Sequence, residues 1–379
     1  MNQKITSRIA PTPSGFLHAG NVYNFLLTYL FTRAFGGILY LRIDDYDLPR
    51  YRRQYVENIF RVLEMLGVDF DGGPSGVGEF ETKFSSKFRL DAYKNALKKL
   101  EQKGACYACE CSHSMKNSFK NGIYTRVCAE KNLKFKKDET AMRLRTIDGA
   151  QINIQQNLIN FDALGCSVGL EASLAGGLWG NAQKVQDGTA NGLKNSANLV
   201  GSDRGKPGGE KFNLNAVGNS GESFLNLANL GVLNLTDETA FETEKFAQAQ
   251  SVNLAQILGD FVVWKKDDMP AYNLASLVDD EILGVNLLVR GEDLLACSAA
   301  QKYMAQMLGY DFENANFIHH GLLAHGGKKL SKSSSAPAVS VADGAKIHYK
   351  FAALKLGLDA SKCDTLSNLL EMFKEKFGR

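Results

Sequence analysis

The chain has 379 residues, enough for one large domain or two to three smaller ones with a substantial hydrophobic core. Hydrophobic residues make up 44% and charged residues 22%, as in ordinary globular proteins, and the net charge of +3 excludes a globally basic surface for nucleic acid. The chain has no basic-then-apolar leader, and no apolar run approaches the roughly 18–20 residues that span a bilayer. These features predict a cytoplasmic protein without a membrane segment, and we expect a monomer.

The first 104 residues alternate between strand and helix patterns. A strand is expected to end at Pro11 and Pro13, which favour extended or turn backbone. Asn21 is the expected N-cap of the helix that follows, and Gly36 ends that helix. The predicted elements are strands at 5–10 and 38–43 and helices at 21–35, 53–66 and 88–103. This alternation predicts a parallel α/β sheet.

Residues 151–250 differ in kind from the rest of the chain, because they are rich in Gly and Asn and poor in charge. Such a composition favours loops or poor order, although a short-stranded β appendage remains an alternative. Regular patterning returns at 258–264, and the later predicted elements are strands at 287–290 and 317–323 and a helix at 298–308, capped by Ser298 and ended by Gly309. The sequence therefore predicts two α/β blocks separated by a long insertion.

Four of the seven cysteines crowd into one stretch. They are Cys106, Cys109, Cys111 and Cys128. Clustered cysteines in a reducing compartment more often bind a metal than form disulfides. The scattered Cys166, Cys297 and Cys363 are expected to be packed or surface residues.

Two segments have the properties of phosphate sites. In the turn that precedes the first helix, His18 can donate to a phosphate while Gly15 and Gly20 permit close approach, and the helix dipole favours an anion there. The alternative for His18 is a capping or core histidine. Lys328, Lys329 and Lys332 form a basic loop that suits triphosphate oxygens, although a solvated surface run is the usual reason for such a stretch.

The order and content of these motifs resemble the class I aminoacyl-tRNA synthetases, whose HIGH and KMSKS signatures hold ATP. The glutamyl branch is the most similar, and within it the glutamyl-Q tRNA(Asp) synthetases. The matching segments are Arg8–His18, Leu41–Arg50, Gly259–Val262, Ala271–Ala275, Val278–Asp280, Val289–Leu295 and Lys329–Ala338. The resemblance covers about residues 5–148 and 255–345, and the segment 151–250 has no recognised counterpart.

The resemblance implies an α/β fold: a Rossmann-like parallel sheet with a small zinc-bearing insertion and a short helical C-terminal tail. The expected organisation is a catalytic domain in two halves, 1–104 and 251–335, interrupted by a zinc-binding insertion at 105–150 and the Gly/Asn-rich insertion at 151–250, with a tail at 336–379. Only 47 residues follow Lys332. That length favours the glutamyl-Q enzymes over ordinary glutamyl-tRNA synthetases, which carry a large anticodon-binding region.

The resemblance also implies roles for individual residues. The expected glutamate site comprises Arg8, Ile9, Ala10, Pro11, Thr12, Asp44, Tyr272 and Arg290. The expected ATP site comprises His18, Gly20, Asn21, Lys329 and Lys332, with His18 and Lys332 as the catalytic residues. Asp44 would bind the substrate ammonium where the family usually has Glu, so a shifted ammonium or a bridging water is needed. For Arg8 or Arg290 alone, an internal salt bridge is the alternative, for instance between Arg290 and Glu292 or Asp293.

For the cysteine stretch the resemblance implies zinc held by Cys109, Cys111, Tyr124 and Cys128. Zinc favours thiolates in a tetrahedral array. A site of four thiolates that includes Cys106 remains open, and His113 is a weaker competitor.

The resemblance implies activation of glutamate by ATP without tRNA, with Mg²⁺ assisting ATP. Glutamate is then expected to be esterified onto the queuosine of tRNA(Asp).

 The sequence leaves two alternatives open, a truncated glutamyl-tRNA synthetase that acts on a tRNA 3′ end and a catalytically inactive paralogue that serves as a binding module.

Overall fold

The computed structural model describes residues 4–112, 115, 118–154, 250–325, 328–329 and 338–378, which belong to one compact unit. His113, Lys332 and nearly all of the Gly/Asn-rich segment lie outside the described residues. In chain order, the first half contains β1 (Thr6–Ile9), α1 (Ala19–Ala34), β2 (Ile38–Leu41), α2 (Arg53–Met65), α3 (Val77–Glu79), α4 (Leu90–Gln102), β3 (Cys106–Cys109), β4 (Phe119–Lys120), β5 (Ile123–Tyr124), β6 (Ala141–Leu144) and β7 (Gln151–Ile154). The second half contains β8 (Gln250–Asn253), α6 (Leu254–Ile257), β9 (Phe261–Trp264), α7 (Tyr272–Ile282), β10 (Leu287–Gly291), α8 (Leu295–Leu308), β11 (Asn316–His320), β12 (Ala324–His325), β13 (Lys328–Lys329), α9 (Lys346–Lys355) and α10 (Leu366–Phe377).

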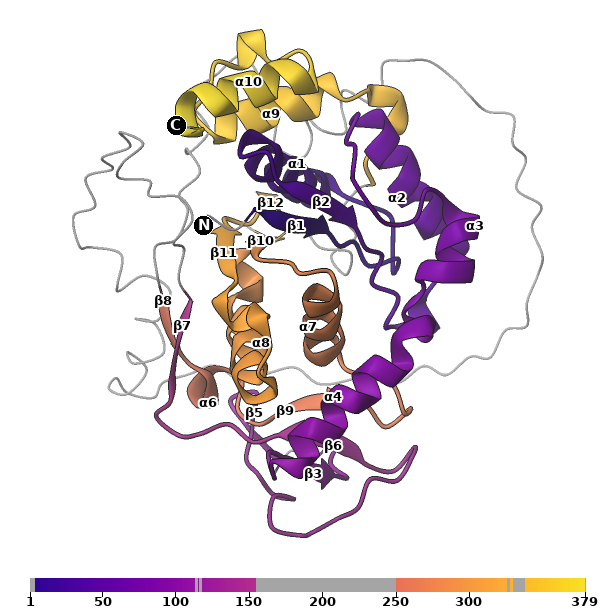
Figure 1. Ribbon diagram of the computed structural model, residues 1–379, viewed down its shortest axis with the longest axis vertical. Helices are drawn as coiled ribbons and strands as arrows, with labels where there is room; N and C mark the ends of the chain where they lie inside the picture. Colours follow the sequence, from indigo (N-terminus) through magenta and orange to yellow (C-terminus); the bar gives the residue numbers. More distant parts are fainter. Residues whose placement is uncertain are drawn as a thin grey trace, which may run out of the picture. The chain divides into compact units, whose positions relative to one another are not determined.

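Two pairs of parallel strands form the centre of the fold (Figure 1). β1 pairs with β2 and β10 with β11, and each pair is joined by a crossover helix, α1 in the first and α8 in the second. The backbone N–H of Asn286 donates to the carbonyl of Thr6 at 3.0 Å and so connects the two pairs. The parallel α/β arrangement expected from the alternating pattern is confirmed.

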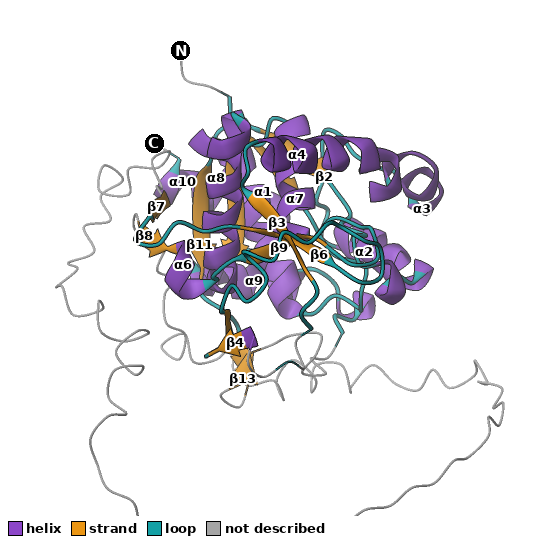
Figure 2. Ribbon diagram, turned by 90° about the horizontal axis from the view of Figure 1, so that it is seen from below, coloured by secondary structure: helices purple, strands orange, loops and turns teal. Residues whose placement is uncertain are grey.

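Helices cover both faces of the β10–β11 pair, as the strand residues themselves indicate. His319 contacts Ser298 of α8, whereas the ring of the next residue, His320, lies 5.3 Å from that of Tyr23 in α1. Because successive strand residues point to opposite faces, α8 and α1 lie on opposite sides of the strands. Figure 2 shows the strands between these helices.

The C-terminal helices α9 and α10 pack against α1. The rings of Phe31 and Phe373 meet edge to face at 5.0 Å, and both side chains are fully buried. Because α1 is apolar on nearly all sides, it needs the strands on one side and these helices on the other. Among the described residues, no helix combines the length and hydropathy needed to cross a membrane.

A separate antiparallel sheet contains the cysteine-rich stretch. Its strand order is β3-β6-β9, with the hairpin β4–β5 beside it, and β7 pairs with β8. β9 therefore joins the chain that follows the long insertion to the strands that precede it. The buried Trp264 of β9 belongs to the core that α4, α7 and α8 also build.

Two local expectations need correction. The N-cap of α1 is His18 and not Asn21, which instead completes a capping box by accepting from the His18 backbone N–H at 3.0 Å. α8 begins at Leu295 and not at Ser298, because the 3-10 turn at Glu292–Leu294 leads directly into it. Its end at Gly309 is confirmed, where φ is 67°.

Candidate active site

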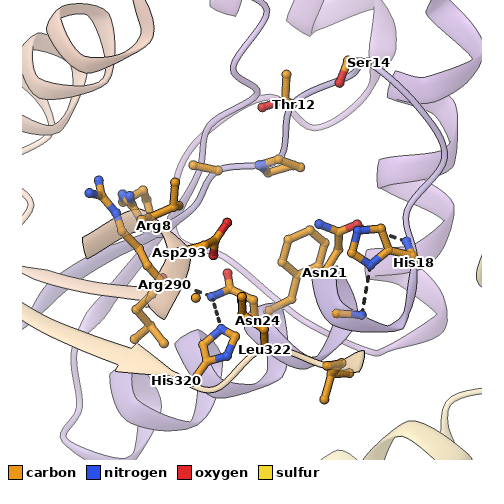
Figure 3. A pocket seen from close by; sticks show the side chains of 18 of the residues that line it. Arg8, Thr12, Ser14, His18, Asn21, Asn24, Arg290, Asp293, His320 and Leu322 are labelled. Atoms are coloured by element: carbon orange, nitrogen blue, oxygen red, sulfur yellow. Dashed lines mark hydrogen bonds between the residues drawn. The ribbon is translucent and has the colours of Figure 1, made fainter. Parts of the chain in front are cut away.

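A cavity of about 480 Å³ lies where the ends of β1 and β10 meet the beginning of α1. Its volume falls in the range of about 300–1,000 Å³ that is usual for small-molecule sites. The residues expected from the sequence that line it are Arg8, Ala10, Pro11, Thr12, His18, Gly20, Asn21, Tyr272 and Arg290. Arg8 and Arg290 lie together at one end of it, and His18 and Asn21 lie at the other (Figure 3). The cavity therefore has one end with two guanidinium groups and one end at a helix N-terminus.

Asp280 of α7 connects the arginines at the first end. Its Oδ1 accepts from Arg8 Nε at 2.8 Å and from Arg42 Nη1 at 2.6 Å, and its Oδ2 lies 3.6 Å from Arg290 Nη2. Burial alone would raise the pKa of Asp280, but the charges of Arg42, Arg8 and Arg290 outweigh burial and lower it. Asp280 is therefore a carboxylate that three guanidinium groups share.

Charge in this buried group is unbalanced. Three cations, Arg8, Arg42 and Arg290, face two anions, Asp44 and Asp280, and each of the five residues is at most 5% exposed. Burial, together with the charge of Arg8, lowers the pKa of Arg290. Since a buried cation without a full counter-charge is costly, the arrangement favours an anionic ligand beside Arg8 and Arg290.

Asp44 lies just after β2, within this group but not among the residues that line the cavity. It forms a bidentate ion pair with Arg42, at 2.7 and 3.2 Å, and accepts from the Tyr46 hydroxyl at 3.2 Å. Burial raises the pKa of Asp44, and Arg42 partly offsets this effect. A ligand ammonium would have to reach a carboxylate that is already engaged by an arginine, so the role of Asp44 stays a prediction.

At the second end of the cavity, His18 caps α1. Its Nδ1 accepts from the backbone N–H of Gly20 at 3.2 Å, so the neutral ring carries its proton on Nε2. A Cβ at Gly20 would lie 3.0 Å from Cε1 of His18, so a larger residue there would require the imidazole to shift by a few tenths of an ångström. His18 is thus a capping residue, as in the alternative to phosphate binding, and it also lines the cavity.

The remaining expected residues are less completely described. Ile9 lies at the end of β1, buried and outside the cavity lining. Lys329 lies in β13, and Lys332 lies outside the described residues. Tyr272 begins α7, and burial raises the pKa of its hydroxyl, which stays protonated at neutral pH.

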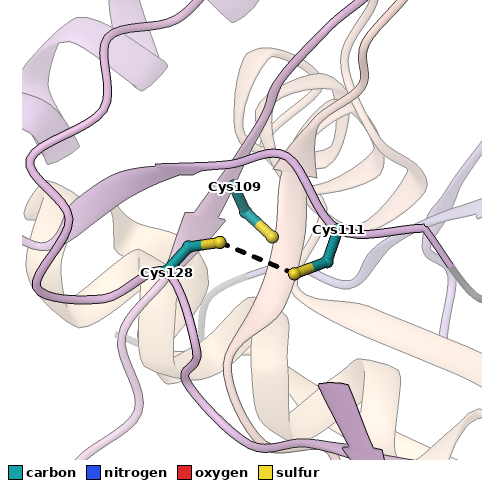
Figure 4. Close-up of side chains that lie close together, drawn as sticks. All are labelled: Cys109, Cys111 and Cys128. Atoms are coloured by element: carbon teal, nitrogen blue, oxygen red, sulfur yellow. Dashed lines mark hydrogen bonds between the residues drawn. The ribbon is translucent and has the colours of Figure 1, made fainter. Parts of the chain in front are cut away.

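The thiols of Cys109, Cys111 and Cys128 converge in the antiparallel sheet and its neighbouring loops (Figure 4). The three sulfur atoms lie within 4.8 Å of one another and are buried. The Tyr124 hydroxyl lies 3.3 Å from Cys109 Sγ and 3.6 Å from Cys111 Sγ. Three thiols and one hydroxyl at this spacing fit a tetrahedral zinc ion.

Cys106 does not belong to this cluster. It packs against the large core of α4, α7 and α8, whereas Cys109 lies in the small core around Tyr124. The two cysteines are three residues apart in β3, and an odd separation puts side chains on opposite faces of a strand. Burial raises the pKa of Cys106 to about 12, as expected for a packed thiol.

Comparison with known proteins identifies the family. The model of the catalytic domain of class I tRNA synthetases (E and Q) matches residues 4–151 and 237–354. The chain belongs to this family. It is 28% identical over 333 residues to a glutamate–tRNA ligase 2 of Syntrophus aciditrophicus (strain SB), which covers 88% of the chain and 52% of that protein. It is 27% identical over 341 residues to a glutamyl-Q tRNA(Asp) synthetase of Pseudomonas putida (strain GB-1), which covers 90% of the chain and 81% of that protein.

The fold comparison agrees with the class I synthetase family. A glutamate tRNA ligase from Elizabethkingia meningosepticum, solved in complex with its amino acid, superposes with a TM-score of 0.57 at 17% identity, covering 99% of this chain and 66% of that one. The α/β class I synthetase fold expected from the sequence is therefore confirmed. The chain spans about half the length of the glutamate–tRNA ligase that it matches in sequence.

Several residues of this synthetase site were not singled out from the sequence. Asn24 and His320 line the cavity and are hydrogen-bonded to each other at 3.0 Å, and Asp293 lines it too. Asp280 occurs in a segment that matched the family, but nothing in the local pattern assigned it a role. Only the packing of α7 against the strands brings its carboxylate to three arginines.

Proposed function

We propose that this synthetase activates glutamate with ATP in the absence of tRNA and then transfers glutamate onto the queuosine of tRNA(Asp). One observation carries the proposal: Arg8 and Arg290, from the two parallel strand pairs, line one end of a cavity whose other end is the His18-capped beginning of α1. The first end suits a carboxylate, and the second suits the phosphates of a nucleotide. The glutamyl-Q relative supports the proposal, since the chain covers 81% of it.

In this proposal the two arginines bind the carboxylates of glutamate. The excess of one buried positive charge among Arg8, Arg42, Arg290, Asp44 and Asp280 supports an acidic substrate. Tyr272 and Thr12 line the same cavity and would hydrogen-bond the substrate, beside the strand end formed by Ile9, Ala10 and Pro11. Asp44 would bind the ammonium through a shifted position or a bridging water.

The reaction needs positioning and charge stabilisation, but no covalent enzyme intermediate. The α-carboxylate of glutamate attacks the α-phosphorus of ATP in line, the bond to the β-phosphate oxygen breaks, and pyrophosphate leaves. His18 would donate from Nε2 to a phosphate oxygen, with Gly20 and Asn21 at the same helix end. Lys329 and Lys332 would neutralise the leaving pyrophosphate together with Mg²⁺. A hydroxyl of queuosine then attacks the carbonyl carbon of the adenylate, and AMP leaves.

We further propose that Cys109, Cys111, Tyr124 and Cys128 hold one structural zinc ion. The convergence of three thiols around the Tyr124 hydroxyl supports this ligand set, and the separate packing of Cys106 argues against four thiolates. Metal analysis of Tyr124→Phe and Cys106→Ser tests it. We expect zinc to be weakened in Tyr124→Phe and fully retained in Cys106→Ser, and the reverse result would favour four thiolates.

Glutamate-dependent exchange between ATP and pyrophosphate is the decisive test of the first step. We expect exchange without any tRNA. Exchange that appears only after addition of tRNA(Glu) would contradict tRNA-independent activation, and no exchange under either condition would indicate an inactive binding module.

Charging assays then decide the acceptor. We expect glutamate to be transferred to queuosine-containing tRNA(Asp) and not to tRNA(Glu). The similarity to a glutamate–tRNA ligase favours the second candidate, a synthetase that charges a tRNA 3′ end. Transfer to tRNA(Glu) alone would establish that candidate instead.

A further inference from the structure

We propose that Ser298 and Gln301 form a neutral clamp that holds Arg290 beside the cavity with one edge of its guanidinium unpaired, and that this clamp makes the site select an acidic amino acid over the corresponding amide. The inference rests on the proposed function, since it concerns how the same site recognises glutamate. Ser298 and Gln301 act here as positioning residues, because neither lines the cavity.

The sheet register and one helix bring the clamp together. Arg290 of β10 is paired with His319 of β11 in a parallel register, so their side chains lie on the same face. α8 crosses that face, and Ser298 and Gln301 lie three residues apart on one side of it. Both clamp residues are fully buried, and Arg290 and His319 are each 3% exposed.

The clamp uses one nitrogen of Arg290. Nη1 donates to Ser298 Oγ at 3.1 Å and to Gln301 Oε1 at 2.7 Å, which engages both of its N–H groups. The Ser298 hydroxyl is also hydrogen-bonded to His319 Nε2, 3.0 Å away. Burial and the charge of Arg290 lower the pKa of His319 to about 3, so this ring is neutral at neutral pH.

The other edge of the guanidinium is buried and has no hydrogen-bond partner among the described residues. This edge consists of Nε and Nη2 of Arg290, and Nη2 is 3.6 Å from Asp280 Oδ2. The N–H bonds on this edge run parallel and match the two oxygens of a carboxylate. An amide would place its NH₂ group against one of these donors, and a buried donor left without an acceptor costs a large part of the binding energy.

Neutrality of the clamp is the feature that sets the selectivity. An acidic residue at the position of Gln301 would orient Arg290 equally well, but it would also neutralise the charge that attracts the substrate. Gln301 and Ser298 satisfy Nη1 through hydrogen bonds and leave the positive charge for the ligand. Asp280 does not cancel that charge alone, because Arg8 and Arg42 share its other oxygen.

Glutamate- and glutamine-dependent pyrophosphate exchange by the full chain tests the clamp. We expect Gln301→Glu to raise the KM for glutamate by at least about tenfold and to reduce the preference for glutamate over glutamine by a similar factor, because the added carboxylate neutralises the charge of Arg290 that attracts the substrate. The KM for ATP should stay within about twofold of the wild-type value, as expected for a change confined to one end of the cavity. Ser298→Ala should raise the KM for glutamate in the same direction, and Ser298→Thr, which keeps the hydroxyl, should restore it.

Ser85→Ala is the matched control. The Ser85 hydroxyl donates to buried Asp45 at 2.6 Å, away from the cavity lining, so its loss removes a comparable buried hydrogen bond to a charged group. We expect this variant to lower thermal stability without changing the ratio of the two KM values. For any clamp variant whose exchange is too slow to measure, calorimetry gives the affinities for glutamate and glutamine directly, in place of the KM values.

Failure of the clamp proposal can be distinguished from failure of the proposed function. Absence of glutamate-dependent exchange in the wild-type protein would overturn the proposed function, and the clamp with it. If the wild-type protein is active, an unchanged KM for glutamate in Gln301→Glu, or equal shifts for glutamate and ATP in both clamp variants, would overturn the clamp alone.

Discussion

Some side chains that line the cavity also form buried ion pairs within the protein. Arg8 and Arg290 line the cavity, yet each also approaches Asp280, so an internal ion pair does not exclude the proposed contact with a substrate. In the alternative of an internal salt bridge, Glu292 and Asp293 were the examples given for Arg290, but the nearby anion is Asp280. Arg42 already engages Asp44, so binding of an ammonium by Asp44 stays a prediction.

Substitution of Asp44 tests whether it binds the substrate ammonium. We expect Asp44→Glu to retain exchange activity, because the carboxylate remains, and Asp44→Asn to raise the KM for glutamate by at least about tenfold, because a buried ammonium loses its charge partner. Thermal unfolding of both variants controls for the loss of the ion pair with Arg42. Wild-type glutamate affinity in Asp44→Asn would show that another group binds the ammonium.

The buried His348 of α9 makes stability depend on pH. Burial lowers its pKa to about 4, with Asp343 opposing the shift, whereas an unfolded histidine has a pKa of about 6.5. Between these values the unfolded chain binds a proton that the folded chain excludes. The free energy of unfolding should therefore fall as the pH drops from about 6.5 to about 4, by up to about 1.4 kcal/mol per pH unit for this group.

Urea denaturation of His348→Leu at several pH values measures this contribution. We expect a slope smaller than that of the wild-type protein by about one proton over the same pH interval. Identical slopes in the two proteins would mean that His348 takes up its proton in the folded state.

At the scale of elements, the beginning of α1 both satisfies its own backbone and lines the cavity. The capping box of His18 and Asn21 satisfies N–H groups that a helix otherwise leaves unpaired, and the same two residues line the cavity. Gly20 lies inside this first turn, where alanine would favour the helix. A Cβ there would lie 3.0 Å from the imidazole of His18, which would have to shift.

Gly20→Ala should therefore lower activity while leaving stability nearly unchanged. We expect the free energy of unfolding to change by less than about 1 kcal/mol, because the better helix propensity of alanine is offset by the weakened His18 cap. Pyrophosphate exchange should fall by at least about tenfold, because the displaced imidazole no longer reaches the phosphate. Gly78→Ala in α3, where a Cβ would meet nothing within 4 Å, is the control and should leave exchange unchanged. Full activity in Gly20→Ala would separate His18 from catalysis.

At the scale of the molecule, α7 joins segments from both halves of the chain. Asp279, the neighbour of Asp280, accepts from Tyr46 at 2.6 Å, from Tyr93 at 2.8 Å and from Arg89 at 2.7 and 2.9 Å. The donors lie after β2, in α4 and just before α4. One helix thus carries two adjacent carboxylates, one directed to the arginines of the site and one that connects the surrounding core.

Asp279→Asn should destabilise the protein without a selective rise in the KM for glutamate. Removing one partner of a buried ion pair costs about 3–5 kcal/mol, and we expect the free energy of unfolding in urea to fall by that amount. Asp69→Asn provides the comparison, because Asp69 pairs with Arg33 at 2.6 Å but its side chain is 67% exposed, and it should cost less than about 1 kcal/mol. Equal losses in the two variants would contradict the structural role of Asp279.

The sequence by itself determined the class of fold and most of the elements, because hydrophobic periodicity and turn residues act locally. It also indicated the cysteine set, the His18 turn and both cavity arginines, since these occur in contiguous motifs. Helix α7 and the true beginnings of α1 and α8 were missed, because capping geometry and packing, rather than propensity, determine them.

Only the tertiary structure decided which charges meet. Arg8, Arg42, Asp280 and Arg290 are spread over 283 positions, and their contacts depend on the parallel strand pairs and on the packing of α7. The same holds for Cys106, which local sequence could not separate from the other cysteines and which the pleat of β3 turns toward a different core. Long-range pairing of buried groups has no local signature, because the energy that selects it arises only when distant segments exclude water together.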